Sequence, residues 1–224
     1  VSSVSGLLKS NGQLFLINPN GIFIGPTGQI KTAGFFAATC RIADEAFLQG
    51  AFTLATVDGA TLVNQGCVEA VGDILFLASQ IENSGTMRAE NIYLLQQPTV
   101  FITENGQNFL IKTDCSTIEE ASISLRENDG NIYALAINQS GIVEADSLLE
   151  ENGRVLLCSA SGRVDVSGEI TASAATNGGT IQILGEKIYL TKETKLDVSG
   201  NSGGSVLIGG DYQGNNPAIL NAKK

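Results

Sequence analysis

The sequence predicts an all-β fold in which short strands stack as the coils of a β-solenoid. Apolar runs of strand length recur, and their first residues lie 18, 40, 23, 26 and 25 residues apart. These runs occupy residues 74–77, 92–95, 132–135, 155–158, 181–184 and 206–209. A further candidate strand at residues 108–111 divides the longest interval in two. A period of about 20 residues without helical periodicity is typical of a solenoid, because a single coil cannot bury its apolar side alone.

A glycine-containing phrase recurs between the strands and supports the same fold. Its full form, Asn-x-Gly-x-x-x-Ala, occurs at residues 64–70 and 83–89, and shorter forms occur at residues 140–145 and 167–172. Glycine at a fixed place between apolar runs marks a turn. With strands stacked about 4.8 Å apart, we expect about nine or ten coils in a rod on the order of 45 Å long.

The first unit of the predicted stack is a strand, a tight turn and a second strand over residues 14–24. Asn18 precedes a proline and therefore favours an extended backbone. Pro19 presets φ for the first central position of the turn. Asn20 or Gly21 can adopt the left-handed conformation that closes it. Alternate side chains of the two strands are expected to point inward, namely those of Leu14, Leu16, Ile22 and Ile24.

Two segments depart from the strand pattern and are expected to leave the stack. Residues 41–48 have helix-favouring composition, which predicts a short helix or a loop. Residues 96–124 form the second irregular segment, in which Pro98 interrupts the pattern and an exposed hairpin or loop is expected. The prediction is therefore a solenoid with extra-helical hairpins or loops.

The charge balance excludes several kinds of partner. The chain has 13 basic and 23 acidic residues, which gives a net charge of −10. It lacks the basic footprint of a nucleic-acid binder and the polybasic cluster that attracts anionic lipid. No apolar run approaches the ~18 residues of a membrane span, so no stable membrane insertion is expected.

The four cysteines, Cys40, Cys67, Cys115 and Cys158, are too widely spaced for a zinc knuckle or a redox dithiol. Free buried thiols are the favoured interpretation, and one disulfide between residues on adjacent coils is the alternative. The turn at residues 127–131 offers oxygen ligands but lacks the spacing of an EF-hand loop. We therefore expect no metal and no cofactor.

An enzymatic function is disfavoured. The chain has no histidine, which excludes a Ser-His-Asp or Cys-His nucleophile. The carboxylates are dispersed and form no paired motif, although stacking could align some of them. Solvated turn residues are the simpler interpretation, and a polysaccharide-active enzyme stays a less favoured alternative.

The segment from Ser10-Asn11-Gly12 to Gly25, followed by residues 33–39, closely resembles the haemagglutination-activity domain of filamentous-haemagglutinin-like exoproteins. Those proteins leave Gram-negative bacteria by two-partner secretion. A Gly-Gly-Asp-Tyr-Gln-Gly phrase at residues 209–214 strengthens the resemblance. It implies a right-handed, single-stranded parallel β-helix and one secretion domain over residues 1–224, without the family's N-terminal cap strands and its downstream effector region. Further residues that match the family motif are Asn11, Gly12, Gly25 and Gly34.

The resemblance also implies a function. The domain would be recognised by an outer-membrane transporter with periplasmic POTRA domains, cross the periplasm, and reach the cell surface or the medium. The motif that the family needs for export matches Asn18, Pro19, Asn20 and Gly21. The family's companion Asn-Pro-Asn-Leu motif does not occur in this chain.

Two interpretations of the turn stay open at this point. The turn stabilises the coil and thereby enables export, or its side chains also contact the transporter. An adhesive module whose β-helix face binds host glycans or proteins is the alternative function. It would require an exposed aromatic or polar stripe along one face.

Overall fold

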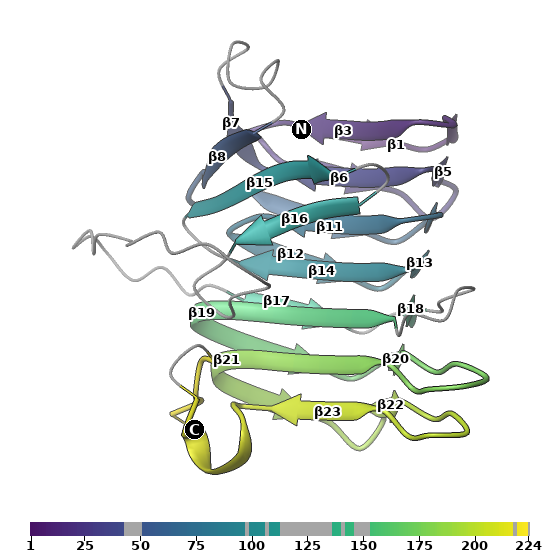
Figure 1. The fold of residues 1–224 in the computed structure, drawn as a ribbon. Helices are drawn as coiled ribbons and strands as arrows, with labels where there is room; N and C mark the ends of the chain where they lie inside the picture. The colour runs from purple at the N-terminus through teal and green to yellow at the C-terminus, as the bar shows by residue number, and fades with distance from the viewer. Residues whose placement is uncertain are drawn as a thin grey trace.

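The computed structural model describes residues 1–42, 51–96, 99–105, 108–112, 136–139, 142–145, 153–216 and 219–223. In this part of the chain, parallel strands stack into a solenoid with three faces, running from the N-terminus at one end to the C-terminus at the other (Figure 1). The parallel β-solenoid predicted from the sequence is confirmed.

Each face is a column of strands from successive rungs. The first face holds β3 (Gln13–Ile17), β6 (Gly34–Ala38), β11 (Asp73–Leu77), β14 (Asn91–Gln96), the start of β19 (Arg154–Val166), the start of β21 (Thr180–Leu190), and β23 (Ser205–Ile208). The second face holds β1 (Ser2–Val4), β4 (Ile22–Ile24), β9 (Thr61–Asn64), β12 (Gln80–Asn83), β17 (Ala136–Gln139) and the ends of β19 and β21. The third face holds β2 (Leu7–Lys9), β5 (Gln29–Thr32), β10 (Cys67–Ala70), β13 (Thr86–Ala89), β18 (Ile142–Ala145), β20 (Glu169–Thr171) and β22 (Lys195–Asp197).

Five of the six apolar runs found in the sequence, those that begin at residues 74, 92, 155, 181 and 206, lie in register on the first face. Ile74 of β11 pairs with Ile92 of β14, and the same column continues through Val155, Ile181 and Val206. Inward side chains from all three faces make one interior cluster, which includes fully buried Ile24 and Phe76. The four residues expected to point inward from the first unit contact this cluster, namely Leu14, Leu16, Ile22 and Ile24.

The number of coils was predicted wrongly. The third face has seven strands in the described residues, rather than nine or ten. The strand at residues 108–111 exists as part of β16 (Asn108–Lys112), but it is not a rung of the stack. It pairs antiparallel with β15 (Thr99–Asn105), so part of the chain leaves the solenoid and contributes no coil.

Two strand-forming segments leave the stack at the same corner. We call the corner between the first and second faces the exit corner. The chain leaves it after β6 and after β14, and the departing strands join in one antiparallel sheet of β7 (Cys40–Arg41), β8 (Ala51–Thr56), β15 and β16 (Figure 1). The hairpin expected within residues 96–124 is thus confirmed. Residues 43–48 and 132–135 lie outside the described residues.

A second apolar cluster lies on the outer side of the first face. It contains Phe36, Leu75, Tyr93 and Leu156 from successive rungs, and Leu54 of β8 contributes from the antiparallel sheet. Ile219 and Leu220 pack against the same cluster after the chain has turned back through a 3₁₀ helix at Tyr212–Gly214. The middle strands of the first face, such as β6 and β11, are therefore buried on both sides.

No helix of the described residues has the length and apolar character needed to span a membrane.

Candidate functional site

The candidate secretion motif forms the exit corner of the first rung, between β3 and β4. The backbone N–H of Asn18 donates to Ala38 O in the rung below at 3.0 Å, and the carbonyl of Asn18 accepts from Gly21 N at 3.1 Å. The Asn18 side chain accepts from Asn20 N through Oδ1 at 2.9 Å and donates to Ser2 Oγ through Nδ2 at 2.9 Å. Every hydrogen-bonding group of Asn18 is therefore used within the fold.

Gly21 closes the turn in a conformation that other residues rarely adopt. Its φ is 109°, and a Cβ atom there would lie 3.1 Å from Thr61 O in the next rung of the second face. Its carbonyl accepts from Ser2 N at 3.0 Å, which ties the turn to β1. Glycine is required here by both backbone conformation and space.

Asn20 and Pro19 form the part of the motif that solvent reaches. Asn20 is exposed, and Pro19 is half-buried. The side chain of Asn20 has no hydrogen-bond partner among the described residues. The motif thus divides into two parts: Asn18 and Gly21 build the turn, while Asn20 and Pro19 are displayed.

The other residues that match the family motif lie apart from this turn. Asn11 and Gly12 are exposed at the opposite end of β3, where Gly12 N donates to Ser10 Oγ at 3.1 Å. Gly34 begins β6 beside Gln13 and is buried. Gly25 follows β4, and its N–H donates to Val4 O at 2.9 Å. These glycines shape corners of the stack and do not join the turn.

Comparison with known proteins agrees with the geometry. A family model described as "TPS secretion domain" matches residues 1–208 of the 224. This chain belongs to the TPS (two-partner secretion) domain family. The crystal structure of the HMW1 secretion domain from Haemophilus influenzae aligns with a TM-score of 0.71 and 30% identity, covering 96% of this chain and 62% of that one.

A curated relative shows how much longer such proteins can be. The heme/hemopexin-binding protein of Haemophilus influenzae is 28% identical over 165 residues, which cover 68% of this chain and 17% of that protein. The family and the fold are those of a secretion domain rather than of an enzyme.

Two glycines of the recurring phrase in this secretion domain, together with Gly28, stack in a column at the corner before the third face. Gly28, Gly66 and Gly85 directly precede β5, β10 and β13. A Cβ atom on Gly66 would lie 2.4 Å from Gly28 O, and one on Gly85 would lie 2.2 Å from Gly66 O. The same carbonyls accept from Cys67 N and Thr86 N, so the rungs approach closely through backbone hydrogen bonds.

The two asparagines of the full phrase form a buried hydrogen-bonded pair, which was not predicted for these residues. Asn64 and Asn83 are in register on β9 and β12, and Asn64 Nδ2 donates to Asn83 Oδ1 at 2.7 Å. Asn64 Oδ1 accepts from Gly66 N at 3.1 Å. These side chains satisfy backbone and side-chain groups that would otherwise be buried without partners. The recurrence of Asn two residues before Gly was the available signal.

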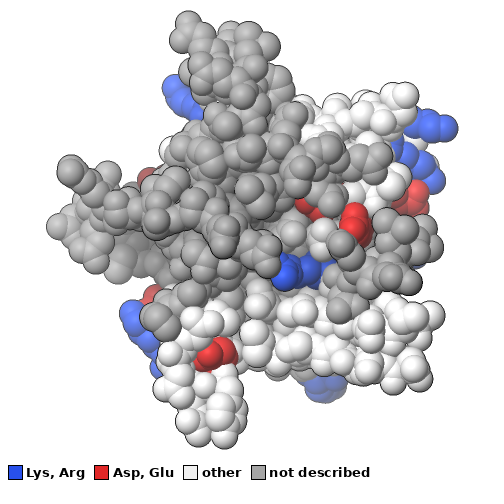
Figure 2. All heavy atoms as spheres, viewed as in Figure 1, with Lys and Arg blue, Asp and Glu red and all other residues white. Residues whose placement is uncertain are grey.

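Charged side chains of the secretion domain lie in small groups on its surface. On the third face, Lys31 Nζ lies 2.8 Å from Glu69 Oε2, and this hydrogen bond and charge hold the pKa of Glu69 below its usual value. Figure 2 shows red and blue atoms scattered over the described part of the face it draws. Among the described residues, no group of three or more His, Cys, Asp or Glu is placed to hold a metal ion.

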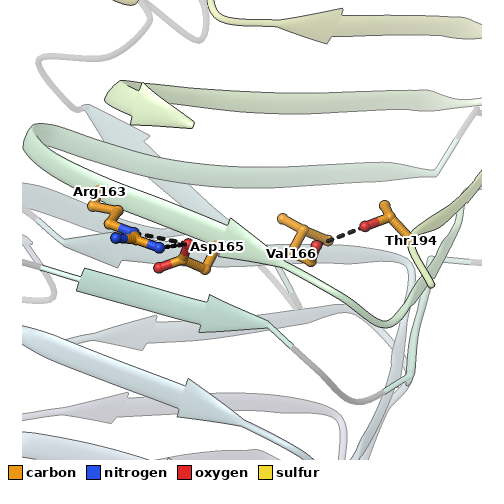
Figure 3. A network of polar contacts seen from close by, with 4 residues as sticks. All are labelled: Arg163, Asp165, Val166 and Thr194. Atoms are coloured by element: carbon orange, nitrogen blue, oxygen red, sulfur yellow. Dashed lines mark hydrogen bonds and ion pairs between the residues drawn. The ribbon is translucent and has the colours of Figure 1, made fainter. Parts of the chain in front are cut away.

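A polar contact group joins neighbouring rungs toward the C-terminal end (Figure 3). Arg163 donates to Asp165 Oδ1 through Nε at 2.8 Å and Nη2 at 2.6 Å. Its guanidinium carbon lies 4.0 Å from the centre of the Tyr189 ring. Thr194 Oγ1 donates to Val166 O at 2.6 Å. The Arg163–Asp165 pair lies within β19, while the contacts of Arg163 with Tyr189 and of Thr194 with Val166 connect β19 to the next rung.

The cysteines differ from the favoured interpretation at one position. Cys158 is disulfide-bonded, which agrees with the alternative of one disulfide, whereas Cys40 and Cys67 are free thiols. Cys115 lies outside the described residues. Burial raises the pKa of Cys40 to about 12, and burial, followed by the charge of Glu69, raises that of Cys67.

We expect alkylation of the folded domain to discriminate between the two free thiols. A raised pKa leaves less thiolate at a given pH, and the thiolate is the reactive form. At pH 8, iodoacetamide should label the half-buried Cys67 slowly and the buried Cys40 hardly at all, whereas both should react in urea. Peptide mass spectrometry measures this. Equal labelling of Cys40 with and without urea would contradict its burial.

Proposed function

We propose that residues 1–224 act as one domain that directs a larger exoprotein through an outer-membrane partner transporter. Family membership supports the secretory role. The small share of the curated relative that this chain covers supports a larger protein. A disulfide at Cys158 is consistent with an oxidising extracellular location. The stack over residues 1–208 and the returning segment at Ile219 and Leu220 support treatment as a single domain.

The proposed mechanism is threading followed by templated folding. The unfolded chain crosses the periplasm, and an extended segment pairs by β-augmentation with the transporter's POTRA domains. After passage, each emerging coil folds on the coil before it. The hydrogen bonds from Cys67 N to Gly28 O and from Thr86 N to Gly66 O are of the kind that would add one rung at a time. Because coils stabilise their neighbours, folding outside the cell biases transport outward.

The proposal that the turn is recognised is supported by the different roles of its residues, because some form the turn and others are accessible to a partner. Each polar group of Asn18 has a hydrogen-bond partner within the fold, whereas the side-chain amide of Asn20 is exposed to solvent. We infer that Asn20, with the ring of Pro19 beside it, is the transporter-contacting part of the motif. Gly21 and Asn18 hold it in place through contacts inside the four-residue turn, Asn20 N to Asn18 Oδ1 and Gly21 N to Asn18 O, which can form before the solenoid folds.

Single substitutions separate these roles. Asn20→Ala is expected to reduce transporter-dependent release of the full precursor about tenfold, the effect of losing roughly one hydrogen bond, and to leave the unfolding midpoint unchanged. Asn18→Ala is expected to lower both release and the unfolding midpoint, because Nδ2 and Oδ1 each satisfy a group of the turn. Release is measured by immunoblotting of the medium, and the midpoint by urea denaturation of the purified domain.

A strain without the transporter is the control for both variants. Equal release of the unaltered precursor from that strain would reject two-partner export. Normal release of Asn20→Ala by the transporter would reject recognition through the displayed side chain.

A further inference from the structure

The last strand of the first face has a neighbouring strand on one side only. β23 pairs with β21, and no further strand follows it among the described residues. Its two inward side chains, Val206 and Ile208, are 37% and 45% exposed, whereas their partners Ile181 and Ile183 are fully buried. Because each rung of a solenoid is stabilised by the rungs beside it, a terminal rung such as this one frays first.

The chain turns back directly after this strand. Gly209 and Gly210 have φ values of 73° and 132°, which other residues rarely adopt. A Cβ atom on Gly210 would also overlap Oδ1 of Asn221. We call residues 209–216 and 219–223 the returning segment. The two glycines are therefore required for its reversal of direction.

The returning segment is bound to both of the preceding strands. Ala222 N donates to Gly209 O at 2.8 Å, and Lys223 N donates to Glu186 O at 2.9 Å. Lys223 Nζ also lies 3.0 Å from Glu186 Oε1. Since Gly209 follows β23 and Glu186 belongs to β21, these contacts connect the two strands in addition to their own ladder (Figure 1).

The returning segment also covers the outer side of the first face at this end. Ile183 pairs with Ile208, so the position next to Leu184 in register is Gly209, which has no side chain. Leu184 is nevertheless fully buried. Ile219 and Leu220 pack against the outer cluster to which Leu184 belongs. The returning segment thus supplies apolar cover where the next strand supplies none.

We propose that the returning segment is a closing element that holds β23 on the stack while the rest of the exoprotein is still crossing the outer membrane. This rests on the proposed function, in which folding outside the cell biases transport outward. The segment acts after passage of the domain, on folded rungs, and takes no part in recognition of the unfolded chain. The last rung is the folded part nearest to the chain inside the transporter, so fraying of that rung would let the chain move back.

The test uses two variants of the returning segment and a control for each. Gly210→Ala prevents the reversal, and Ile219→Ala/Leu220→Ala removes the apolar cover. In both purified variants, the amides that donate from β23 to β21 should exchange hydrogen about tenfold faster, while those of β5 and β10 stay unchanged. In a pulse–chase experiment, the full precursor should reach the medium several times more slowly. Gly203→Ala, whose Cβ would meet nothing within 4 Å, and Tyr212→Ala, which removes an exposed ring, should change neither measurement.

Ile30→Val separates this closing role from a general loss of stability, because Ile30 is fully buried on the distant β5. Faster exchange confined to the last rungs, with slower release than that of Ile30→Val, would support the proposal. Unchanged exchange in both variants would overturn it, since β23 would then be held by the stack alone. Faster exchange with release equal to that of Ile30→Val would also overturn it, because closure would not serve export. Equal release of the unaltered precursor from a strain without the transporter would instead reject the proposed function, whichever exchange is observed.

Discussion

Replacement of Gly85 by alanine is expected to lower the free energy of unfolding by about 1–3 kcal/mol, the usual cost of overpacking a well-packed interior. The new Cβ would lie 2.2 Å from Gly66 O and 2.8 Å from Gly66 N, and backbone atoms cannot rotate away as a side chain would. The rungs would have to separate at Gly66 O, the acceptor for Thr86 N. Urea denaturation followed by circular dichroism measures the change.

Gly6 provides a matched control from the same corner. It precedes β2 as Gly85 precedes β13, but a Cβ atom on Gly6 would meet nothing within 4 Å. Gly6→Ala should therefore leave the urea midpoint almost unchanged. If both substitutions were equally harmful, the cost would come from the turn conformation and not from the approach of stacked rungs.

Phe76→Ala is expected to cost about 3–5 kcal/mol, the largest effect among these substitutions. The ring is fully buried in the interior cluster and packs edge-on against Phe35, with the two centroids 6.0 Å apart. Its neighbours in the column are Ala37 and Leu94, so truncation leaves a cavity between rungs that neither residue can fill. Secretion should fall as well if folding outside the cell supports export.

Tyr212→Ala is the control for Phe76→Ala, since it also removes an aromatic ring. Tyr212 is 82% exposed in the returning segment, and its loss should change the free energy of unfolding by no more than a few tenths of a kcal/mol. A stable Phe76→Ala variant would show that the interior collapses around the missing ring and would contradict rigid stacking of the rungs.

The repeated structural features of this chain were predictable because the sequence pattern behind each of them recurs several times. The apolar runs and the glycine phrase indicated a parallel solenoid, and the structure aligns Ile74 with Ile92 and stacks Gly66 on Gly28. The turn at Asn18–Gly21 was also predictable, since proline and glycine restrict the backbone locally. Only local conformations and periods could be inferred in this way.

The prediction of nine or ten coils failed because period does not reveal where the chain leaves the stack. The residues of β16 have the same apolar, strand-like character as a rung strand, yet they pair antiparallel with β15. A strand pattern specifies the local conformation, while the partner is chosen by what lies beside it in space.

The tertiary structure explains why strands of the first face are apolar at consecutive positions and not at alternating ones. Strands such as β11 are buried at every position, which requires cover on both sides. Leu54 of β8 belongs to the outer cluster that includes Leu75 and Leu77 of β11, and Ile219 and Leu220 pack against the same cluster from the C-terminal segment.

By itself, the sequence determined the strand period, the glycine corners, the tight turn and the resemblance to a secretion domain, since each depends on neighbouring residues. Tertiary structure alone decided the seven-strand third face, the shared exit corner and the contact from Asn18 to Ser2. The physical reason is that register brings residues of different rungs within about 5 Å of one another. The number of residues between two positions in the chain does not by itself predict that they are in contact across rungs.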